Sequence, residues 1–126
     1  MYLRTMPAFL FILAFSVSLL FAQASPAVKP GPLTPEEGKT MVQQKKDQIV
    51  LLDVRNPNEF VASHYPGALN IPANELQARL SEVPTNKPVL VYCAMGIRAQ
   101  RAYEMLKERR PDIKELYFIK GRTIFR

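Results

Sequence analysis

The chain has 126 residues, of which 48% are hydrophobic and 22% are charged, and its formal net charge is +6 at pH 7. This length suffices for one small domain, and not for two, once an N-terminal targeting segment is set aside. The basic residues are scattered and form no stripe in which aromatic residues are regularly interleaved. We therefore expect no nucleic-acid partner and at most a modest field that favours small anions.

Residues 1–24 have the three parts of a secretory signal peptide. Arg4 gives a basic start, residues 8–21 are apolar apart from two serines, and residues 22–24 form a small-x-small cleavage site. The apolar run is shorter than the roughly 20 residues that a membrane-spanning helix needs, although an uncleaved anchor stays open as an alternative. We expect a mature chain that begins at Ser25, is periplasmic or secreted, and has no membrane contact after cleavage.

Residues 25–33 contain three prolines and one glycine, which predicts a short extended linker. The next residues are typical of a helix start. Thr34 is a suitable N-cap, Pro35 occupies the first helical position, and Glu37 is placed to close a capping box. This pattern predicts a helix that runs to about Lys46.

The rest of the expected domain, which spans residues 34–126, alternates strands with helical segments. In chain order we expect a strand at 49–54, a brief helical segment at 56–60, a turn at 65–67, a short strand at 68–71, a helical segment at 75–83, a strand at 89–92, a long helix at 99–110 and a last strand at 116–119. This alternation predicts an α/β fold with an open, mainly parallel sheet and helices on both faces.

Cys93 is the single cysteine of the chain and directly follows the predicted strand at 89–92. It opens a strand-to-helix loop in which Gly96 permits an unusual backbone angle and Arg98 ends the turn. Such a loop directs backbone N–H groups to one point at the positive end of a helix, which favours a thiolate nucleophile beside an anion-binding cradle. The alternative is a small buried hydrophobic residue, which is the ordinary role of a lone cysteine.

A metal site or an organic cofactor is not expected. Cys93 and His64 are the only cysteine and the only histidine, so the chain offers no Cys/His cluster for zinc and no internal disulfide. His64 precedes a Pro-Gly turn, where we expect it to bond to neighbouring backbone rather than to act as a general base. Arg55 ends a strand and is expected to pair with Glu59 across the following turn.

Four segments of the chain carry a family resemblance when they are taken together. They are Leu52-Asp53-Val54-Arg55 with Glu59-Phe60; His64-Tyr65-Pro66-Gly67-Ala68-Leu69-Asn70-Ile71-Pro72; Val91-Tyr92-Cys93-Ala94-Met95-Gly96-Ile97-Arg98-Ala99; and Gly121. The C-x-x-G-x-R loop combined with D-x-R and H-x-P-G-A-x-N-I-P is highly specific. The chain resembles a single-domain rhodanese, and most of all the small exported kind related to phage shock protein E.

The resemblance implies a rhodanese-like domain that is a sulfurtransferase. Sulfane sulfur would pass from thiosulfate or a similar anionic donor to a thiophilic acceptor, cyanide or a thiol, through a persulfide on Cys93. Arg98 would hold the anionic end of the donor if its guanidinium turns inward. Backbone N–H groups of the loop would stabilise the persulfide and the bound anion, and these belong to Ala94, Met95, Gly96, Ile97 and Arg98.

Two other functions stay open. Related phosphatases and arsenate reductases resemble this architecture but use a Cys-x5-Arg loop. The loop from Cys93 to Arg98 is Cys-x4-Arg, one residue shorter, which suits a sulfur atom better than a phosphate. The other alternative is a non-enzymatic exported domain that carries sulfur or forms a mixed disulfide with another protein.

The C-terminus departs from the family pattern, in which Gly-Gly is followed by three residues and Trp. Lys120 stands at the first glycine position, and Phe125 stands at the tryptophan position. This departure puts the packing around the last strand in question. We expect it to touch no residue of the Cys93 loop.

Overall fold

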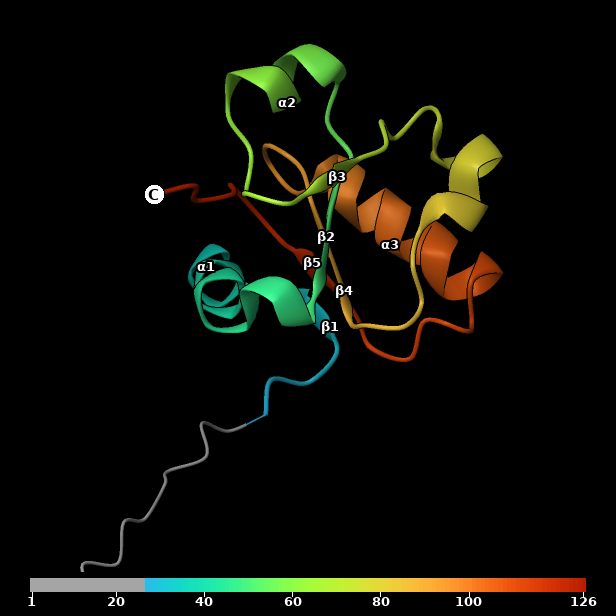
Figure 1. The fold of residues 1–126 in the computed structure, drawn as a ribbon, viewed down its shortest axis with the longest axis horizontal. Coiled ribbons are helices and arrows are strands. Elements are labelled where there is room, and N and C mark those ends of the chain that lie inside the picture. Colours follow the sequence, from blue (N-terminus) through green and yellow to red (C-terminus); the bar gives the residue numbers. More distant parts are fainter. Residues whose placement is uncertain (1–26) are drawn as a thin grey trace, which may run out of the picture.

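The structure is a computed structural model and describes residues 27–126 (Figure 1). The predicted signal peptide at residues 1–24 lies outside the described residues. Among the helices within residues 27–126, none combines the length and the apolar character needed to cross a membrane.

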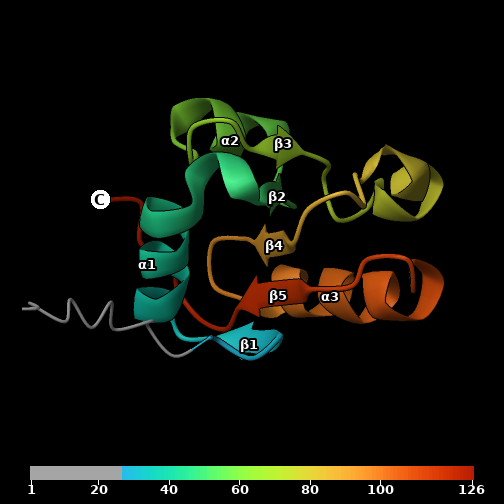
Figure 2. The same cartoon turned by 60° about the horizontal axis from the view of Figure 1, so that its bottom comes forward.

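Strands form one parallel sheet at the centre of the molecule (Figure 2). Every neighbouring pair of strands in it runs parallel. The carboxyl ends of all the strands therefore lie at one edge of the sheet, which is where parallel α/β sheets bind ligands. From one side to the other, the order is β1 (Gly31–Leu33), β5 (Leu116–Ile119), β4 (Val89–Tyr92), β2 (Val50–Asp53) and β3 (Leu69–Asn70).

Helices cover both faces of this sheet, as predicted (Figure 2). On one face, α1 (Pro35–Lys45) packs with a buried cluster that includes Leu51 and Tyr92. On the other face, α3 (Ile97–Arg109) packs with a second cluster. The strands β4 and β5 are buried along their whole length because both of their faces are covered. The prediction of an open parallel sheet with helices on both faces is confirmed.

The start of α1 is stabilised as predicted from its capping box. The backbone N–H of Thr34 donates to Oε2 of Glu37 at 2.8 Å, and the backbone N–H of Glu37 donates to Oγ1 of Thr34 at 3.1 Å. These two bonds satisfy donors that a helix N-terminus otherwise leaves without a partner. A short helix, α2 (Pro57–Ala62), has a similar start, in which the N–H of Asn56 donates to Oε1 of Glu59 at 3.3 Å.

The helical segment expected at 75–83 forms a 3₁₀ helix over Leu76–Glu82 instead of a regular α-helix. Its backbone departs from helical angles at Arg79, whose φ is −124°. Arg110, which follows the end of α3, donates to the backbone carbonyl oxygens of Leu80 and Val83. These side-chain bonds satisfy carbonyl groups at the end of the 3₁₀ helix and tie this helix to α3.

The prediction of a linker over residues 25–33 is wrong for its last three residues. Gly31–Leu33 form β1, which pairs with β5, and the N–H of Lys120 donates to the carbonyl oxygen of Leu33 at 2.8 Å. Leu33 is buried. Pro32 lacks an N–H group, which is tolerated here because β1 lies at the edge of the sheet. The folded domain therefore begins before Thr34.

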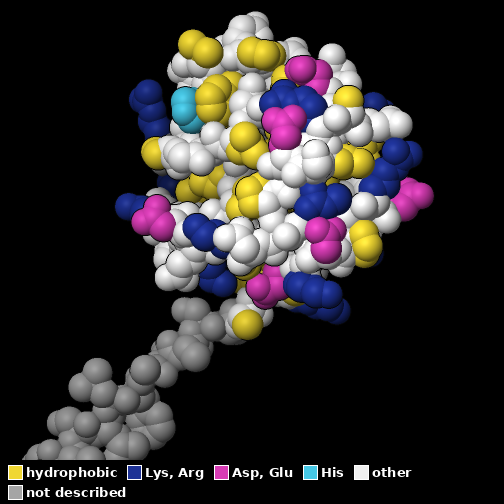
Figure 3. Space-filling model, turned by 45° about the vertical axis from the view of Figure 1, so that its right-hand side comes forward, with side chains coloured by type: hydrophobic (Ala, Val, Ile, Leu, Met, Phe, Trp, Pro, Cys, Tyr) yellow, Lys and Arg dark blue, Asp and Glu magenta, His cyan; other side chains and the backbone are white. Residues whose placement is uncertain are grey.

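Charged side chains are dispersed on the face drawn in Figure 3. Lys and Arg side chains alternate there with Asp and Glu, so the surplus of positive charge does not gather in one patch on this face.

The segment after β5 is well packed, which answers the question raised by its sequence. The ring of Phe125 contacts those of Tyr65 and Tyr92, with centroid distances of 5.1 and 5.8 Å. The guanidinium carbon of Arg55 lies 4.8 Å from the centroid of the Phe125 ring. Burial raises the pKa of Tyr65 to about 12, so its hydroxyl stays neutral and donates to the carbonyl oxygen of Ile124 at 2.5 Å. Phe125 thus packs in an aromatic cluster on the face of the sheet that α1 covers.

Replacing Phe125 with alanine tests this packing. Removal of a fully buried phenylalanine ring costs roughly 3–5 kcal/mol, and Phe125 is only partly buried, so we expect the free energy of unfolding to fall by about 2 kcal/mol. Urea denaturation measures this value. Val61→Ala is the control, because its side chain is 80% exposed and should change stability by less than about 0.5 kcal/mol. Equal losses in the two variants would contradict the packing described here.

Candidate active site

Cys93 follows β4 directly and lies at the middle of the edge where the strands end, because β2 and β5 flank β4. Its side chain is buried, with 1% of the residue exposed, and it joins the apolar cluster beneath α3. Burial alone would fit the alternative of a small hydrophobic residue. The polar contacts of the sulfur atom distinguish the two interpretations.

Within residues 27–126, two backbone N–H groups donate to Sγ of Cys93. The N–H of Gly96 lies 3.0 Å from the sulfur and that of Ala99 lies 3.3 Å from it. Both belong to the start of α3, where backbone donors have no partner inside the helix and the helix dipole is positive. Donors in this arrangement stabilise negative charge on sulfur. Backbone donors at the start of α3 therefore converge on the thiol of Cys93, whereas its predicted role as a nucleophile stays a prediction.

Of the five predicted donors, only Gly96 donates to the sulfur in the described part of the chain, and Ala94, Met95, Ile97 and Arg98 do not. Ala99, the second donor, was missed. The sequence carried a usable signal: with Gly96 as N-cap, the N–H groups of the first helical turn extend to Ala99. The side chains of Met95 and Ile97 are 61% and 65% exposed, so they form the outer surface of the loop rather than its interior.

Gly96 is required for two separate reasons. Its φ is +96°, a left-handed conformation that residues with a side chain rarely adopt. A β-carbon at this position would also lie 2.4 Å from the backbone nitrogen of Gly121. The predicted role of Gly96 as the residue with an unusual backbone angle is confirmed.

Arg98 is bound to a carboxylate. Its Nη1 donates to Oε1 of Glu59 at 2.7 Å, and its Nη2 donates to Oε2 at 3.1 Å. The hydrogen bond from Arg98 is the main cause that lowers the pKa of Glu59 below its usual range. The predicted pairing of Arg55 with Glu59 is wrong, since Arg98 takes this carboxylate and so joins α2 to the start of α3.

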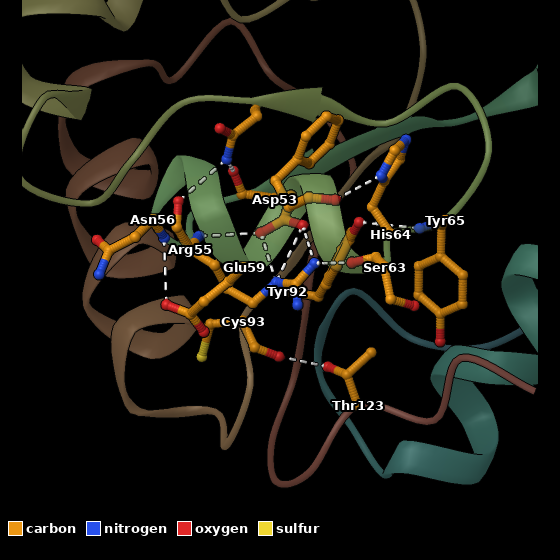
Figure 4. Close-up of polar contacts among 12 residues, drawn as sticks. Asp53, Arg55, Asn56, Glu59, Ser63, His64, Tyr65, Tyr92, Cys93 and Thr123 are labelled. Atoms are coloured by element: carbon orange, nitrogen blue, oxygen red, sulfur yellow. Dashed lines mark hydrogen bonds and ion pairs between the residues drawn. The ribbon is translucent and has the colours of Figure 1, made fainter.

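Arg55 instead pairs with Asp53 in the interior (Figure 4). Its Nε and Nη2 both donate to the carboxylate, with a shortest distance of 2.6 Å, and Nη2 also donates to the carbonyl oxygen of Ser63 at 2.5 Å. Burial opposes the charge of Arg55, but the hydrogen bonds and the attraction of Asp53 outweigh it and raise the pKa of the guanidinium. Asn70 donates to the carbonyl oxygens of Asp53 and Arg55 at 3.0 Å each, and so holds the chain where β2 ends.

His64 bonds to neighbouring backbone, as predicted. Its Nδ1 lies 2.7 Å from the carbonyl oxygen of Phe60, and the two rings are stacked with centroids 3.7 Å apart. Among the described residues, no group of three or more His, Cys, Asp or Glu side chains is arranged to hold a metal ion.

The C-terminal segment contacts the Cys93 loop directly through Thr123, which is not one of the two positions, Lys120 and Phe125, that depart from the family pattern. Oγ1 of Thr123 donates to the carbonyl oxygen of Cys93 at 2.6 Å, and the N–H of Thr123 donates to the carbonyl oxygen of Ala94 at 3.1 Å. Thr123 is buried. Sequence reasoning missed this residue because a lone threonine near a chain end carries no local signal of its contacts.

Comparison with known proteins places this fold and loop in a family. Residues 34–121 match the family model of the Rhodanese-like domain. The chain belongs to this family. Among its relatives, the uncharacterized protein YqhL of Bacillus subtilis is 45% identical over 71 residues, which cover 56% of this chain and 55% of YqhL. The chain thus spans little more than half the length of this relative.

Two further relatives of the rhodanese-like domain are named for sulfur transfer. The thiosulfate sulfurtransferase GlpE of Coxiella burnetii is 36% identical over 77 residues, covering 61% of this chain and 70% of GlpE. The crystal structure of the single-domain sulfurtransferase RDL2 of Saccharomyces cerevisiae superposes with a TM-score of 0.58 at 24% identity. That match covers 79% of this chain and 89% of RDL2, and it shows the shared fold.

Two glycines of the rhodanese-like domain offer a matched test of the loop. Gly67 and Gly96 both have positive φ, +80° and +96°, but a β-carbon at Gly67 would meet nothing within 4 Å. Gly67→Ala should therefore cost only the left-handed backbone penalty, about 1 kcal/mol. Gly96→Ala adds the clash with Gly121 and should cost about 3 kcal/mol. Urea denaturation gives both values, and similar losses would show that the Gly96–Gly121 contact is unimportant.

The Glu59–Arg98 pair predicts a pH-dependent contribution to stability. Because the folded-state pKa of Glu59 lies below its ordinary value of 4.5, the contribution is present above about pH 4.5 and is lost as the pH falls through the folded-state value. Glu59→Gln should lower the free energy of unfolding at pH 7 by less than about 1 kcal/mol, since the pair is partly exposed.

Denaturation of wild type and Glu59→Gln from pH 7 into acid measures this contribution, and the two curves should converge once the pH falls below the lowered folded-state pKa of Glu59. Glu108→Gln, at an exposed carboxylate of α3, controls for the loss of one negative charge. A stability difference that persists unchanged in acid would assign the effect to packing rather than to the ion pair.

Proposed function

We propose that this rhodanese-like domain is a thiosulfate sulfurtransferase in which Cys93 carries the transferred sulfur. The observation that supports this most directly is the pair of N–H groups, from Gly96 and Ala99, that surround Sγ at the start of α3. N–H donors at this position would stabilise the negative charge that the attacking sulfur and then the persulfide carry. The sulfurtransferase relatives support the same chemistry.

The reaction takes two steps and needs no oxidant, metal or organic cofactor. The thiolate of Cys93 attacks the outer sulfur of thiosulfate, a new S–S bond forms, and sulfite leaves with the electron pair of the broken bond. Cyanide or an acceptor thiolate then attacks the outer sulfur of the persulfide. The bond to Sγ breaks, its electron pair returns to Cys93, and thiocyanate or a persulfide of the acceptor is released.

In this proposal, Arg98 does not meet the donor as a free cation. Its guanidinium already binds Glu59, so an anionic donor has to share it or displace the carboxylate. Because Cys93 is buried, the donor reaches Sγ only after a local movement of the surrounding groups. The exposed side chains of Met95 and Ile97 lie on the loop segment that such a movement would involve.

A phosphatase is a weaker proposal for this loop. Its Cys-x4-Arg spacing is one residue shorter than the Cys-x5-Arg spacing of the related phosphatases, and its donors converge on the sulfur atom itself. A sulfur carrier that passes its persulfide to another protein would use the same first step.

We further propose that residues 1–24 direct export and that the mature domain acts in the periplasm or outside the cell. The support is the basic start, the apolar run and the Ala-Gln-Ala site. This would make the protein similar to the small exported rhodaneses related to phage shock protein E.

Intact mass spectrometry tests the proposed function. Thiosulfate should add one sulfur atom to the wild-type domain, and cyanide should remove it again. Cys93→Ser should gain no sulfur and should lose turnover, because an alkoxide of serine forms no persulfide, while its thermal unfolding stays close to that of the wild type.

Two results would contradict the sulfurtransferase proposal. One is equal sulfur transfer by wild type and Cys93→Ser. The other is efficient hydrolysis of aryl phosphates by a wild type that takes no sulfur from thiosulfate. Sulfur uptake without release to cyanide or small thiols would favour the carrier alternative instead.

A further inference from the structure

Thr123 binds two consecutive carbonyl groups of the Cys93 loop. Its hydroxyl donates to the carbonyl oxygen of Cys93 at 2.6 Å, and its backbone N–H donates to that of Ala94 at 3.1 Å. The residue is 6% exposed, so water does not compete for these bonds. One residue of the C-terminal segment therefore sets the orientation of two successive peptide groups next to the nucleophile.

The orientation of these peptide groups determines where their N–H groups point. The described chain contains no cis peptide, and in a planar trans peptide the C=O and N–H bonds point in opposite directions. Because Thr123 holds the carbonyl oxygens of Cys93 and Ala94, the N–H groups of Ala94 and Met95 are directed away from Thr123. In Figure 4, the carbonyl oxygen of Cys93 points to Thr123 and its sulfur atom points elsewhere.

Thr123 can serve as a fixed support because its own segment is held on both sides. Before it, Gly121 lies against Gly96 so closely that a β-carbon on Gly96 would not fit. After it, Tyr65 binds the carbonyl oxygen of Ile124, and Phe125 packs in the aromatic cluster. The Cys93 loop therefore packs against a C-terminal segment that is itself fixed by contacts on both sides of Thr123.

We propose that Thr123 is a positioning residue for Cys93. Its hydroxyl holds the peptide group between Cys93 and Ala94 and so fixes the path of the loop from Cys93 to Gly96, whose N–H donates to the sulfur. This inference rests on the proposed sulfur transfer for its effect on turnover. Its effect on the reactivity of the thiol is independent of that function.

The experiment compares Thr123→Val, which keeps the shape and loses the hydroxyl, with Thr123→Ser, which keeps the hydroxyl. For Thr123→Val we expect the rate of Cys93 alkylation by iodoacetamide at pH 7 and the kcat with thiosulfate each to fall about tenfold, the effect of one lost hydrogen bond. Thr123→Ser should stay within about threefold of wild type in both. The amide proton of Gly96, observed by NMR, should shift in the valine variant and return in the serine variant.

Arg110→Met is the matched control for a loss of stability alone. Arg110 follows α3 at the opposite end of that helix from Cys93, and its side chain binds backbone carbonyl oxygens there. This variant should be less stable than wild type and yet be alkylated at the wild-type rate. If Thr123→Val does not fold, Thr123→Ala, which cannot overfill the site, replaces it.

Three outcomes separate the two proposals. Alkylation of Thr123→Val at the rate of wild type and Arg110→Met would overturn the positioning role. A serine variant as slow as the valine variant would also overturn it, because the hydroxyl would then not be responsible. If wild type takes no sulfur from thiosulfate while the alkylation rates behave as expected, the positioning role stands and the sulfurtransferase function fails.

Discussion

A close contact between two backbone segments determines the shape of the Cys93 loop. Gly96, in the loop after β4, lies against Gly121, in the segment after β5, with no space for a β-carbon between them. Because β4 and β5 are neighbouring parallel strands, their carboxyl ends bring these glycines together. The contact fixes where α3 begins, and hence where the N–H groups of Gly96 and Ala99 meet the sulfur. The parallel pairing of β4 and β5 therefore determines which backbone N–H groups contact the sulfur.

The buried ion pair of Asp53 and Arg55 stabilises the chain where β2 ends, at the same edge of the sheet as Cys93. Two buried charges are costly unless their hydrogen-bonding groups find partners. Here Asp53 accepts bonds from both the side chain and the backbone N–H of Arg55, and Arg55 also donates to Ser63. The guanidinium further covers the ring of Phe125. The pair thus connects the end of β2, the end of α2 and the C-terminal segment.

Local sequence patterns predicted most of the fold and the centre of the site. Apolar runs identified β2, β4 and β5, because such strands are buried on both faces, and the Thr34 capping box identified α1. The nucleophile candidate and the need for Gly96 followed from residue type and spacing in one short loop. The family resemblance supplied the expected activity, which no local pattern contains.

Contacts between distant segments could not be predicted in the same way. Arg98 binds Glu59, which lies 39 residues earlier, and Thr123 binds Cys93, which lies 30 residues earlier. The choice of Arg98 over Arg55 as the partner of Glu59 depends on the position of α2, which only the folded chain defines. The strand β1 was missed because a three-residue segment containing Gly31 and Pro32 has weak strand propensity. It forms a strand because it pairs with β5, a contact that the local sequence does not show.

The two outer strands also bear on how the folded protein behaves at high concentration. An unpaired sheet edge can recruit another chain and start aggregation. Here β3 has only two residues, and β1 has three with Pro32 at its centre, so each edge presents few free N–H and C=O groups to a second molecule. Short edge strands of this kind are one means by which sheet proteins limit pairing with a second copy.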